Sequence, residues 1–214
     1  MPRLWRVDGN SEVVELERHS GYGKGEGVKY GVILADPPWV YQNSAVRGNA
    51  ADKYTLTDTA CLCEMPIASL AAPDSVLVMW ATWPCLTDAM QLIPAWGFKY
   101  VTAFPWVKLQ DAPFVDLMGD HVIGAPAYGT GFWVRGCTEP ILIAKRGQPR
   151  IPESGHLGLI SKRFEHSRKP DNIYDYCETM DGPYLELFAR RRRPGWNAFG
   201  NEVEGSIQLT ADAV

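Results

Sequence analysis

The sequence has no hydrophobic run long enough to cross a membrane. Among its 214 residues the longest strictly apolar stretch is the six residues 76–81, whereas a membrane-spanning helix needs about 20. The first eight residues also lack the apolar core of a secretory signal peptide. We therefore expect a cytoplasmic protein without membrane association. Its 46% hydrophobic and 21% charged residues are the proportions of an ordinary globular enzyme.

Cysteine is scarce and irregularly spaced. The chain holds five cysteines: Cys61, Cys63, Cys85, Cys137 and Cys177. An odd number without regular spacing argues against a disulfide framework. Cys61 and Cys63 lie two residues apart, but no second Cys or His pair stands at the spacing of zinc ligands. We therefore expect small buried thiols and no metal site.

A surplus of positive charge is also absent, although many proteins that bind nucleic acid carry one. The formal net charge is −4. Residues 1–134 hold 9 Lys and Arg against 14 Asp and Glu, a net −5, whereas residues 135–200 hold 12 against 8, a net +4. A surface that contacts phosphates would therefore be local and built from the C-terminal half.

Apolar strands alternate with amphipathic helices from Tyr30 onward. Short apolar runs predict buried strands at 32–35, 75–80, 100–107, 141–144 and 184–188. Periodic apolar residues predict three helices: one capped by Asp58, one with Leu86, Met90 and Ile93 on its inner face, and one that begins at Pro170 with Ile173, Tyr176, Cys177 and Met180 inside. This order predicts an α/β fold with a Rossmann-like, doubly wound and mostly parallel sheet.

The length of the chain predicts one domain that spans residues 1–214. Residues 1–29 are expected to be peripheral, because a glycine occupies every other position from 21 to 27. Residues 109–131 are rich in Gly and Pro and are predicted to be a loop insertion. Residues 204–214 are predicted to be a tail.

A ligand site is expected where the predicted strands end. In doubly wound sheets, ligands bind outside the carboxyl ends of the strands. Asp36 follows the first buried strand and Arg190 follows the last one. Both side chains should therefore lie at the ligand-binding edge of the sheet.

The tetrapeptide Asp36-Pro37-Pro38-Trp39 suits the methylation of an adenine amine. That nitrogen is a poor nucleophile, because its lone pair is delocalised into the ring. An ionised Asp36 and a neighbouring proline carbonyl can accept hydrogen bonds from the two amine hydrogens. Pro37 fixes the backbone angle φ and lacks an N–H that would repel the amine, and Trp39 offers a face for stacking the base. The alternative is a turn with a carboxylate cap and a buried tryptophan.

Further motifs extend over most of the chain. They are KY at 53–54, LVMWAT at 77–82, AWGF at 95–98, PWVK at 105–108, KRGQP at 145–149, HSRKPD at 166–171, ELFAR at 186–190 and PGWNAFGNEV at 194–203. Together with the tetrapeptide, they make the sequence from about Tyr30 to Val203 resemble the MT-A family. This family is named for the large catalytic subunit of the messenger-RNA adenosine N6-methyltransferase, and the resemblance is strongest to its compact bacterial and phage members.

The resemblance implies the fold of S-adenosylmethionine-dependent methyltransferases in the family's permuted order, with the catalytic tetrapeptide first and the cofactor strand last. It implies that S-adenosylmethionine is the cofactor, held by Asp36, Pro38, Glu186, Arg190, Arg192, Asn201 and Glu202. Glu186 or Glu202 would accept hydrogen bonds from ribose hydroxyls, and the arginines would bind the methionine carboxylate. The predicted catalytic residues are Asp36, Pro37, Pro38 and Trp39. The predicted substrate contacts are Tyr41, Tyr54, Arg146 and Lys169, the last through a phosphate.

The sequence departs from the eukaryotic subunit near its cofactor end. Arg192 and Arg193 stand in place of His and Asn, Glu202 in place of Gln, and Arg168 in place of His. Four consecutive arginines, 190–193, repel one another unless anions lie nearby. At least two of them are therefore expected to contact a ligand, either the cofactor carboxylate or a phosphate.

The sequence thus predicts an enzyme that methylates the N6 amine of adenine in nucleic acid. DNA is the favoured substrate because the compact prokaryotic members are most similar, and RNA is the alternative. If the substrate is a duplex, the target base must be flipped out. A catalytically silent partner subunit of the same fold is a second hypothesis. Methylation of a protein amide is a third, which Asp instead of Asn at position 36 disfavours. We expect a monomer or homodimer from a bacterium or a phage.

Overall fold

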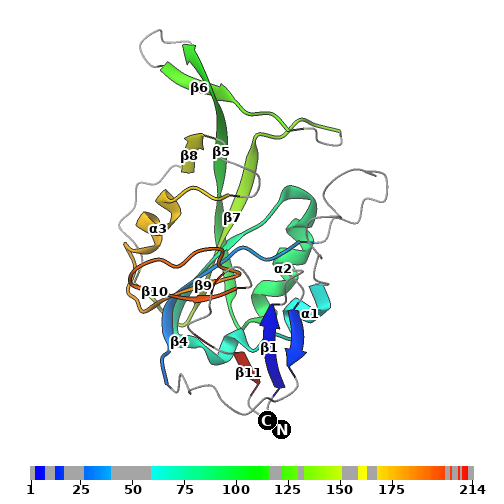
Figure 1. The fold of residues 1–214 in the computed structure, drawn as a ribbon, viewed down its shortest axis with the longest axis vertical. Coiled ribbons are helices and arrows are strands. Elements are labelled where there is room, and N and C mark those ends of the chain that lie inside the picture. Colours follow the sequence, from blue (N-terminus) through cyan, green and yellow to red (C-terminus); the bar gives the residue numbers. More distant parts are fainter. Residues whose placement is uncertain are drawn as a thin grey trace.

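The computed structural model of the protein shows strands and helices arranged around one large sheet (Figure 1). The structure describes residues 3–7, 13–16, 27–39, 59–115, 122–129, 133–150, 159–162, 168–200, 203, 207 and 209–211. No helix among these residues is long and apolar enough to cross a membrane.

The large sheet has eight strands in the order β10-β9-β3-β4-β7-β5-β6, with β8 beside β5. Their bounds are β3 (Tyr30–Ala35), β4 (Ala71–Trp80), β5 (Lys99–Val115), β6 (Val122–Pro126), β7 (Thr138–Arg146), β8 (Leu159–Lys162), β9 (Tyr184–Leu187) and β10 (Trp196–Phe199). Strands β10, β9, β3 and β4 are parallel, whereas β7 is antiparallel to both β4 and β5, and β6 is antiparallel to β5. The α/β class was predicted correctly. The sheet is mixed, however, and not the regular doubly wound parallel sheet that was predicted: β5 and β8 are parallel, but β7 and β6 run antiparallel to their neighbours.

Helices cover both faces of the sheet. On one face lie α1 (Thr59–Cys63), α2 (Leu86–Ala95) and the short 3₁₀ helices η1 (Ile67–Ser69) and η2 (Trp83–Cys85), whereas α3 (Asn172–Cys177) packs on the other. Successive residues of a strand point to opposite faces, so Ile33 packs with the first group and Val32 and Leu34 pack with α3. Because both faces of β3 are covered, all six of its residues are buried.

The inner face of α2 differs in part from the prediction. Ala89, Leu92 and Ile93 are buried, whereas Met90 is 39% exposed. The helix begins at Leu86, so the face toward the sheet is set by the i, i+3 and i+4 neighbours around Ala89. Each fully buried Leu or Ile stabilises the fold by about 1.5–3 kcal/mol.

The direction of β7 determines which of its ends reaches the ligand edge. Trp80, the last residue of β4, pairs with Ile141, near the start of β7, and Ser75 pairs with Arg146, the last residue of β7. The beginning of β7 therefore lies at the carboxyl edge of β3 and β4, beside Asp36. Its end lies at the opposite edge.

Strand β5 continues beyond its pairing with β7 and pairs with β6, and this part of the sheet extends away from the rest of the protein (Figure 1). The end of β5 and all of β6 fall within residues 109–131, where the sequence predicted a loop. The chain then passes through residues 127–137 before it enters β7.

A second, three-stranded sheet brings the two ends of the chain together (Figure 1). It has the order β11-β1-β2, with β1 (Arg3–Val7) antiparallel to both β2 (Val13–Leu16) and β11 (Leu209–Ala211). Leu209 is fully buried in the same core cluster as α2. Strands thus occupy parts of residues 1–29, which were predicted to be a peripheral segment, and of residues 204–214, which were predicted to be a tail.

All five cysteines lie among the described residues and are free thiols. Cys85 and Cys177 are buried, as expected, but Cys61 is exposed. Within the described part of the chain, no group of three His, Cys, Asp or Glu side chains could hold a metal ion.

Candidate active site

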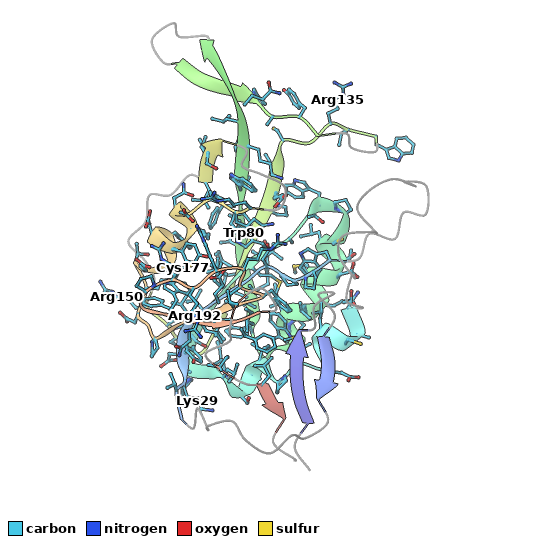
Figure 2. The ribbon with its side chains drawn as sticks, viewed as in Figure 1. Lys29, Trp80, Arg135, Arg150, Cys177 and Arg192 are labelled. Atoms are coloured by element: carbon cyan, nitrogen blue, oxygen red, sulfur yellow. The ribbon has the colours of Figure 1, made fainter. Side chains whose placement is uncertain are left out.

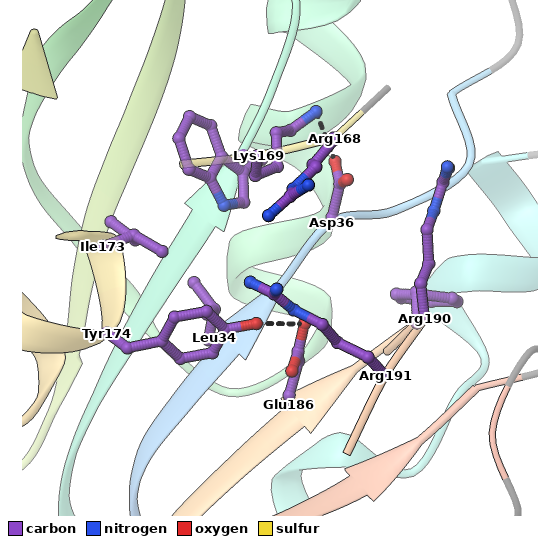
Figure 3. A pocket seen from close by; sticks show the side chains of 11 residues that line it. Leu34, Asp36, Arg168, Lys169, Ile173, Tyr174, Glu186, Arg190 and Arg191 are labelled. Atoms are coloured by element: carbon purple, nitrogen blue, oxygen red, sulfur yellow. Dashed lines mark hydrogen bonds and ion pairs between the residues drawn. The ribbon is translucent and has the colours of Figure 1, made fainter. Parts of the chain in front are cut away.

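A pocket of 340 Å³ lies at the carboxyl ends of β3, β4 and β9 (Figure 3). Its lining includes two carboxylates, four basic side chains and several apolar groups: Leu34, Asp36, Trp80, Arg168, Lys169, Ile173, Tyr174, Glu186, Phe188, Arg190 and Arg191. Asp36 and Arg190, which the sequence placed at this edge, do meet here. Pockets that bind small organic ligands measure about 300–1,000 Å³, so the size fits such a ligand.

Asp36 belongs to a chain of alternating charges. The Lys169 Nζ atom lies 3.1 Å from Asp36 Oδ1 and 3.2 Å from Glu139 Oε2. The other oxygen of Glu139 is bonded to Lys108. Lys169 also lies over the Trp80 ring, 5.2 Å from its centroid. Four charged side chains from four segments thus hold one another, and the Lys169 contact is to only one of the two carboxylate oxygens of Asp36.

The pKa values of Lys169 and Glu139 follow from this pairing. Burial acts to lower the pKa of Lys169, but Asp36 and Glu139 outweigh it, and the pKa lies above its ordinary value. Burial acts to raise the pKa of Glu139, but Lys169 and Lys108 together bring it below its ordinary value. Both groups are therefore charged at neutral pH.

Lys169 was predicted to contact a substrate phosphate, and this contact stays a prediction. Its side chain is only 21% exposed and its ammonium group already has two carboxylate partners. Two of the three N–H donors of the ammonium thus have partners within the protein. In the structure, Lys169 contacts Asp36 and Glu139 at the same time.

The other three residues of the tetrapeptide, Pro37, Pro38 and Trp39, hold the turn that carries Asp36. Pro37 is buried and Pro38 is half-buried. Trp39 is 6% exposed, and its Nε1 donates a hydrogen bond of 3.1 Å to the backbone oxygen of Trp80. The predicted stacking of a base on Trp39 is not supported, since the ring packs in the core and is outside the pocket lining. Trp39 instead fastens the turn to the end of β4.

Glu186 is the second carboxylate of the pocket. It pairs with Leu34 across β9 and β3, two positions before Asp36. The Tyr174 hydroxyl donates a hydrogen bond of 3.0 Å to Glu186 Oε1 (Figure 3). Burial, together with the nearby Asp36, raises the pKa of Glu186 to about 7, although Tyr174 and Arg193 act in the opposite direction. This carboxylate therefore changes its charge near neutral pH.

The arginine cluster is partly neutralised by acids of the protein itself. Arg191 is bonded to Asp171, and Arg193 Nε lies 3.2 Å from Glu178 Oε1. Arg193 also covers the Tyr174 ring, 4.5 Å from its centroid. Acids of the protein thus supply part of the negative charge near the cluster, and the expected ligand contact of at least two of the four arginines stays a prediction. Arg190 and Arg191 line the pocket, whereas Arg192 is outside the lining.

Arg146 does not lie near the target site, contrary to the prediction. Its Nη1 donates a hydrogen bond of 2.6 Å to the backbone oxygen of Ala68 in η1. Arg146 is at the end of β7, which is antiparallel, and this end is at the edge of the sheet away from Asp36. Four further predicted site residues lie outside the described residues: Tyr41, Tyr54, Asn201 and Glu202.

Sequence reasoning did not single out four residues at or beside this pocket: Glu139, Lys108, Tyr174 and Arg168. Glu139 comes just before the buried run of β7, and in a parallel strand that position would be far from the ligand edge. Only the antiparallel direction of β7 brings it to Asp36. The available signal was a charged residue near each end of the predicted strand 141–144, Glu139 and Arg146. This signal did not show which end reaches the ligand-binding edge.

An α/β sheet with two carboxylates and several arginines at the carboxyl ends of its strands places the protein in the class of ligand-binding α/β folds. The MT-A70 family model matches residues 30–202. Because the match covers most of the chain, the protein belongs to the MT-A70 family. The family resemblance seen in the sequence is thereby confirmed.

Three curated relatives have similar sequences. The human N(6)-adenine-specific methyltransferase METTL4 is 30% identical over 190 residues, which is 81% of this chain and 37% of METTL4. The type II methyltransferase M.MunI of a Mycoplasma species is 30% identical over 199 residues, covering 82% of this chain and 78% of M.MunI. The N6-methyladenosine RNA methyltransferase MTA1 of Pyricularia oryzae is 32% identical over 188 residues, covering 81% of this chain and 47% of MTA1. The chain thus spans less than half of two of these relatives.

Proposed function

We propose that the protein is an S-adenosylmethionine-dependent methyltransferase that acts on the N6 amine of adenine in nucleic acid, with DNA preferred. The observation that carries this proposal is the position of Asp36, held by Lys169 at the lining of a pocket that also contains Glu186. Membership of the MT-A70 family and the names of the relatives support it.

The residues around Asp36 account for activation of the amine. Lys169 holds one carboxylate oxygen, so the other has a defined direction toward the amine. Trp39 anchors the turn through Trp80, and the two prolines restrict the backbone between them. A proline carbonyl of this turn would accept the second amine hydrogen. Fixed acceptors lower the barrier because they need no reorganisation when the nitrogen becomes more tetrahedral.

The polar groups of the pocket fit the cofactor. When bound, S-adenosylmethionine supplies an electrophilic methyl group on a sulfonium. This molecule has cationic groups and one carboxylate, and the pocket offers both kinds of partner. Asp36 and Glu186 would face the cationic groups, and Arg190 and Arg168 at the rim would bind the carboxylate. The contributions of Arg192, Asn201, Glu202 and Pro38 to cofactor binding stay predictions, as do those of Tyr41 and Tyr54 to substrate binding.

The preference for DNA rests on the compact relatives. The chain covers 78% of M.MunI, a type II methyltransferase, but 47% of the relative named as an RNA methyltransferase. Radiolabelled methyl transfer to DNA and RNA oligonucleotides of the same sequence tests this preference. We expect label in DNA; label in RNA alone would overturn the preference.

Asp36→Asn tests the proposed role of the carboxylate. The change keeps the size of the side chain but removes its negative charge, so we expect the rate of methyl transfer to fall by about 100-fold or more. Asp181→Asn is the matched control, because Asp181 is an exposed carboxylate outside the pocket. Full activity of Asp36→Asn would refute the mechanism. A protein that neither transfers methyl groups nor gains thermal stability from S-adenosylmethionine would instead be a silent partner subunit.

A further inference from the structure

The chain between β6 and β7 forms an arm, which we call the aromatic arm (residues 127–137; 127–129 and 133–137 are described). Its two sides are hydrogen-bonded to each other, since Gly129 N donates to Gly136 O at 2.9 Å. Strand β5 joins both sides at the root, where Ala127 N donates to Lys108 O and Lys108 N donates to Cys137 O, each at 2.8 Å. In Figure 2, Arg135 marks the arm, which extends away from the main body.

Large side chains on the aromatic arm face solvent. Trp133 is fully exposed, at 104%, and Tyr128 is 55% exposed. Val134 beside Trp133 is exposed as well. Trp133 has a φ of 64°, in the left-handed region that a bulky residue rarely adopts. A strained backbone that holds an indole in water suggests a surface built for a partner.

The charged residues of the arm indicate which kind of partner it can bind. Residues 122–138 contain no Asp and no Glu, and their one charged side chain is Arg135. This differs from a chain whose net charge is −4. Aromatic faces beside an arginine, without acids, match the bases and phosphates of a nucleic-acid strand.

The root of the arm lies at the proposed active site. Thr138, directly after the arm, accepts a hydrogen bond of 2.9 Å from Trp83 Nε1, and Glu139 follows in the charge chain that holds Asp36. Thr138 is five positions after Trp133, a span of at most about 18 Å. The arm can therefore reach nucleotides next to a base in the pocket.

From this placement we infer that the aromatic arm binds the strand that flanks the target adenine. Trp133 stacks on a neighbouring base and Arg135 contacts a phosphate. This inference rests on the proposed function, because it names the surface with which the same site holds its substrate.

The test compares Trp133→Ala and Trp133→Phe with Tyr100→Ala in the full-length protein. Tyr100 is the matched control: it is 39% exposed and stands at the other end of β5. The probe is a fluorescein-labelled, adenine-containing single-stranded DNA oligonucleotide. The same measurements are repeated with the equivalent RNA oligonucleotide. For Trp133→Ala we expect Kd by anisotropy, and KM for methyl transfer, to rise about tenfold through loss of one stacking contact. Trp133→Phe should retain most of the affinity, and Tyr100→Ala and cofactor binding should be unchanged.

Salt dependence separates the two residues. Arg135→Gln should reduce the slope of log Kd against log salt by about one, whereas Trp133→Ala should weaken binding without changing that slope. The inference is overturned if the wild type methylates the oligonucleotide and Trp133→Ala binds it equally well. It is also overturned if Trp133→Ala converts a sedimenting dimer into a monomer, since the arm would then contact a second copy. A wild type that neither binds nor methylates either oligonucleotide would refute the proposed function itself.

Discussion

At the scale of single residues, Asp36 and Glu186 share one pocket but have different partners. Asp36 lies 3.1 Å from a charged Lys169, whereas Glu186 accepts a hydrogen bond from the neutral Tyr174 hydroxyl. Burial without a full counter-charge raises the pKa of Glu186 to about 7. A bound cation would favour its ionised form, so the proposed cofactor should bind more tightly as the pH rises through neutrality.

The stability of the ligand-free protein should change in the opposite direction. The folded-state pKa of Glu186, about 7, is above the ordinary value of 4.5, so the folded chain holds a proton that the unfolded chain releases between these values. This stabilisation is complete below the ordinary pKa and is lost as the pH rises through about 7. Between these two pH values, we expect the free energy of unfolding of the wild type to fall by up to about 3 kcal/mol more than that of Glu186→Gln.

Urea denaturation at a series of pH values measures this difference in the free energy of unfolding. Asp181→Asn is the control, because its side chain is 73% exposed. Parallel pH profiles for wild type and Glu186→Gln would show that Glu186 titrates with its ordinary pKa.

At the scale of elements, β7 explains which site residues the sequence could predict. The residues 141–144 were correctly predicted as a buried strand, because their apolar run is a local property. The run is the same in either direction, so it could not show whether Glu139 or Arg146 reaches the pocket. The antiparallel pairing with β4 places Glu139 there and sends Arg146 to the opposite edge.

This arrangement predicts opposite outcomes for the two ends of β7. Glu139→Gln leaves Lys108 without a charged partner at this position and loosens Lys169, so Asp36 loses its fixed position. We expect kcat to fall at least about tenfold, with little change in cofactor Kd. Arg146→Gln removes the hydrogen bond to Ala68, so we expect its free energy of unfolding to fall by about 1–2 kcal/mol. Its kcat should be unchanged. Steady-state kinetics and urea denaturation of both variants test this; a larger kcat loss in Arg146→Gln would contradict it.

At the scale of the whole molecule, the two ends of the chain complete the fold. Strand β11 pairs with β1, and Leu209 adds a fully buried side chain to the cluster that contains Leu92 and Leu77. Sequence pattern alone did not reveal this, because three-residue strands carry almost no periodicity and their pairing joins residues about 200 positions apart.

Leu209→Ala should therefore destabilise the protein by about 2–5 kcal/mol, through lost burial and a residual cavity. The measurement is the free energy of unfolding in urea. Ile160→Ala provides the comparison. Ile160 is an apolar residue that is 59% exposed, so its truncation should change the free energy of unfolding little. Equal losses in the two variants would show that the C-terminal strand does not contribute to the core.

The sequence by itself determined the buried strands, the acceptor-rich turn after the first of them, and membership of the MT-A70 family. These depend on runs of neighbouring residues, whose chemistry and spacing are local. Only the tertiary structure decided the mixed direction of the sheet, the ion pairs that hold Asp36, the burial of Trp39 and the exposure of Trp133. These depend on which strands pair and in which direction, and side-chain periodicity is the same whichever way a strand runs.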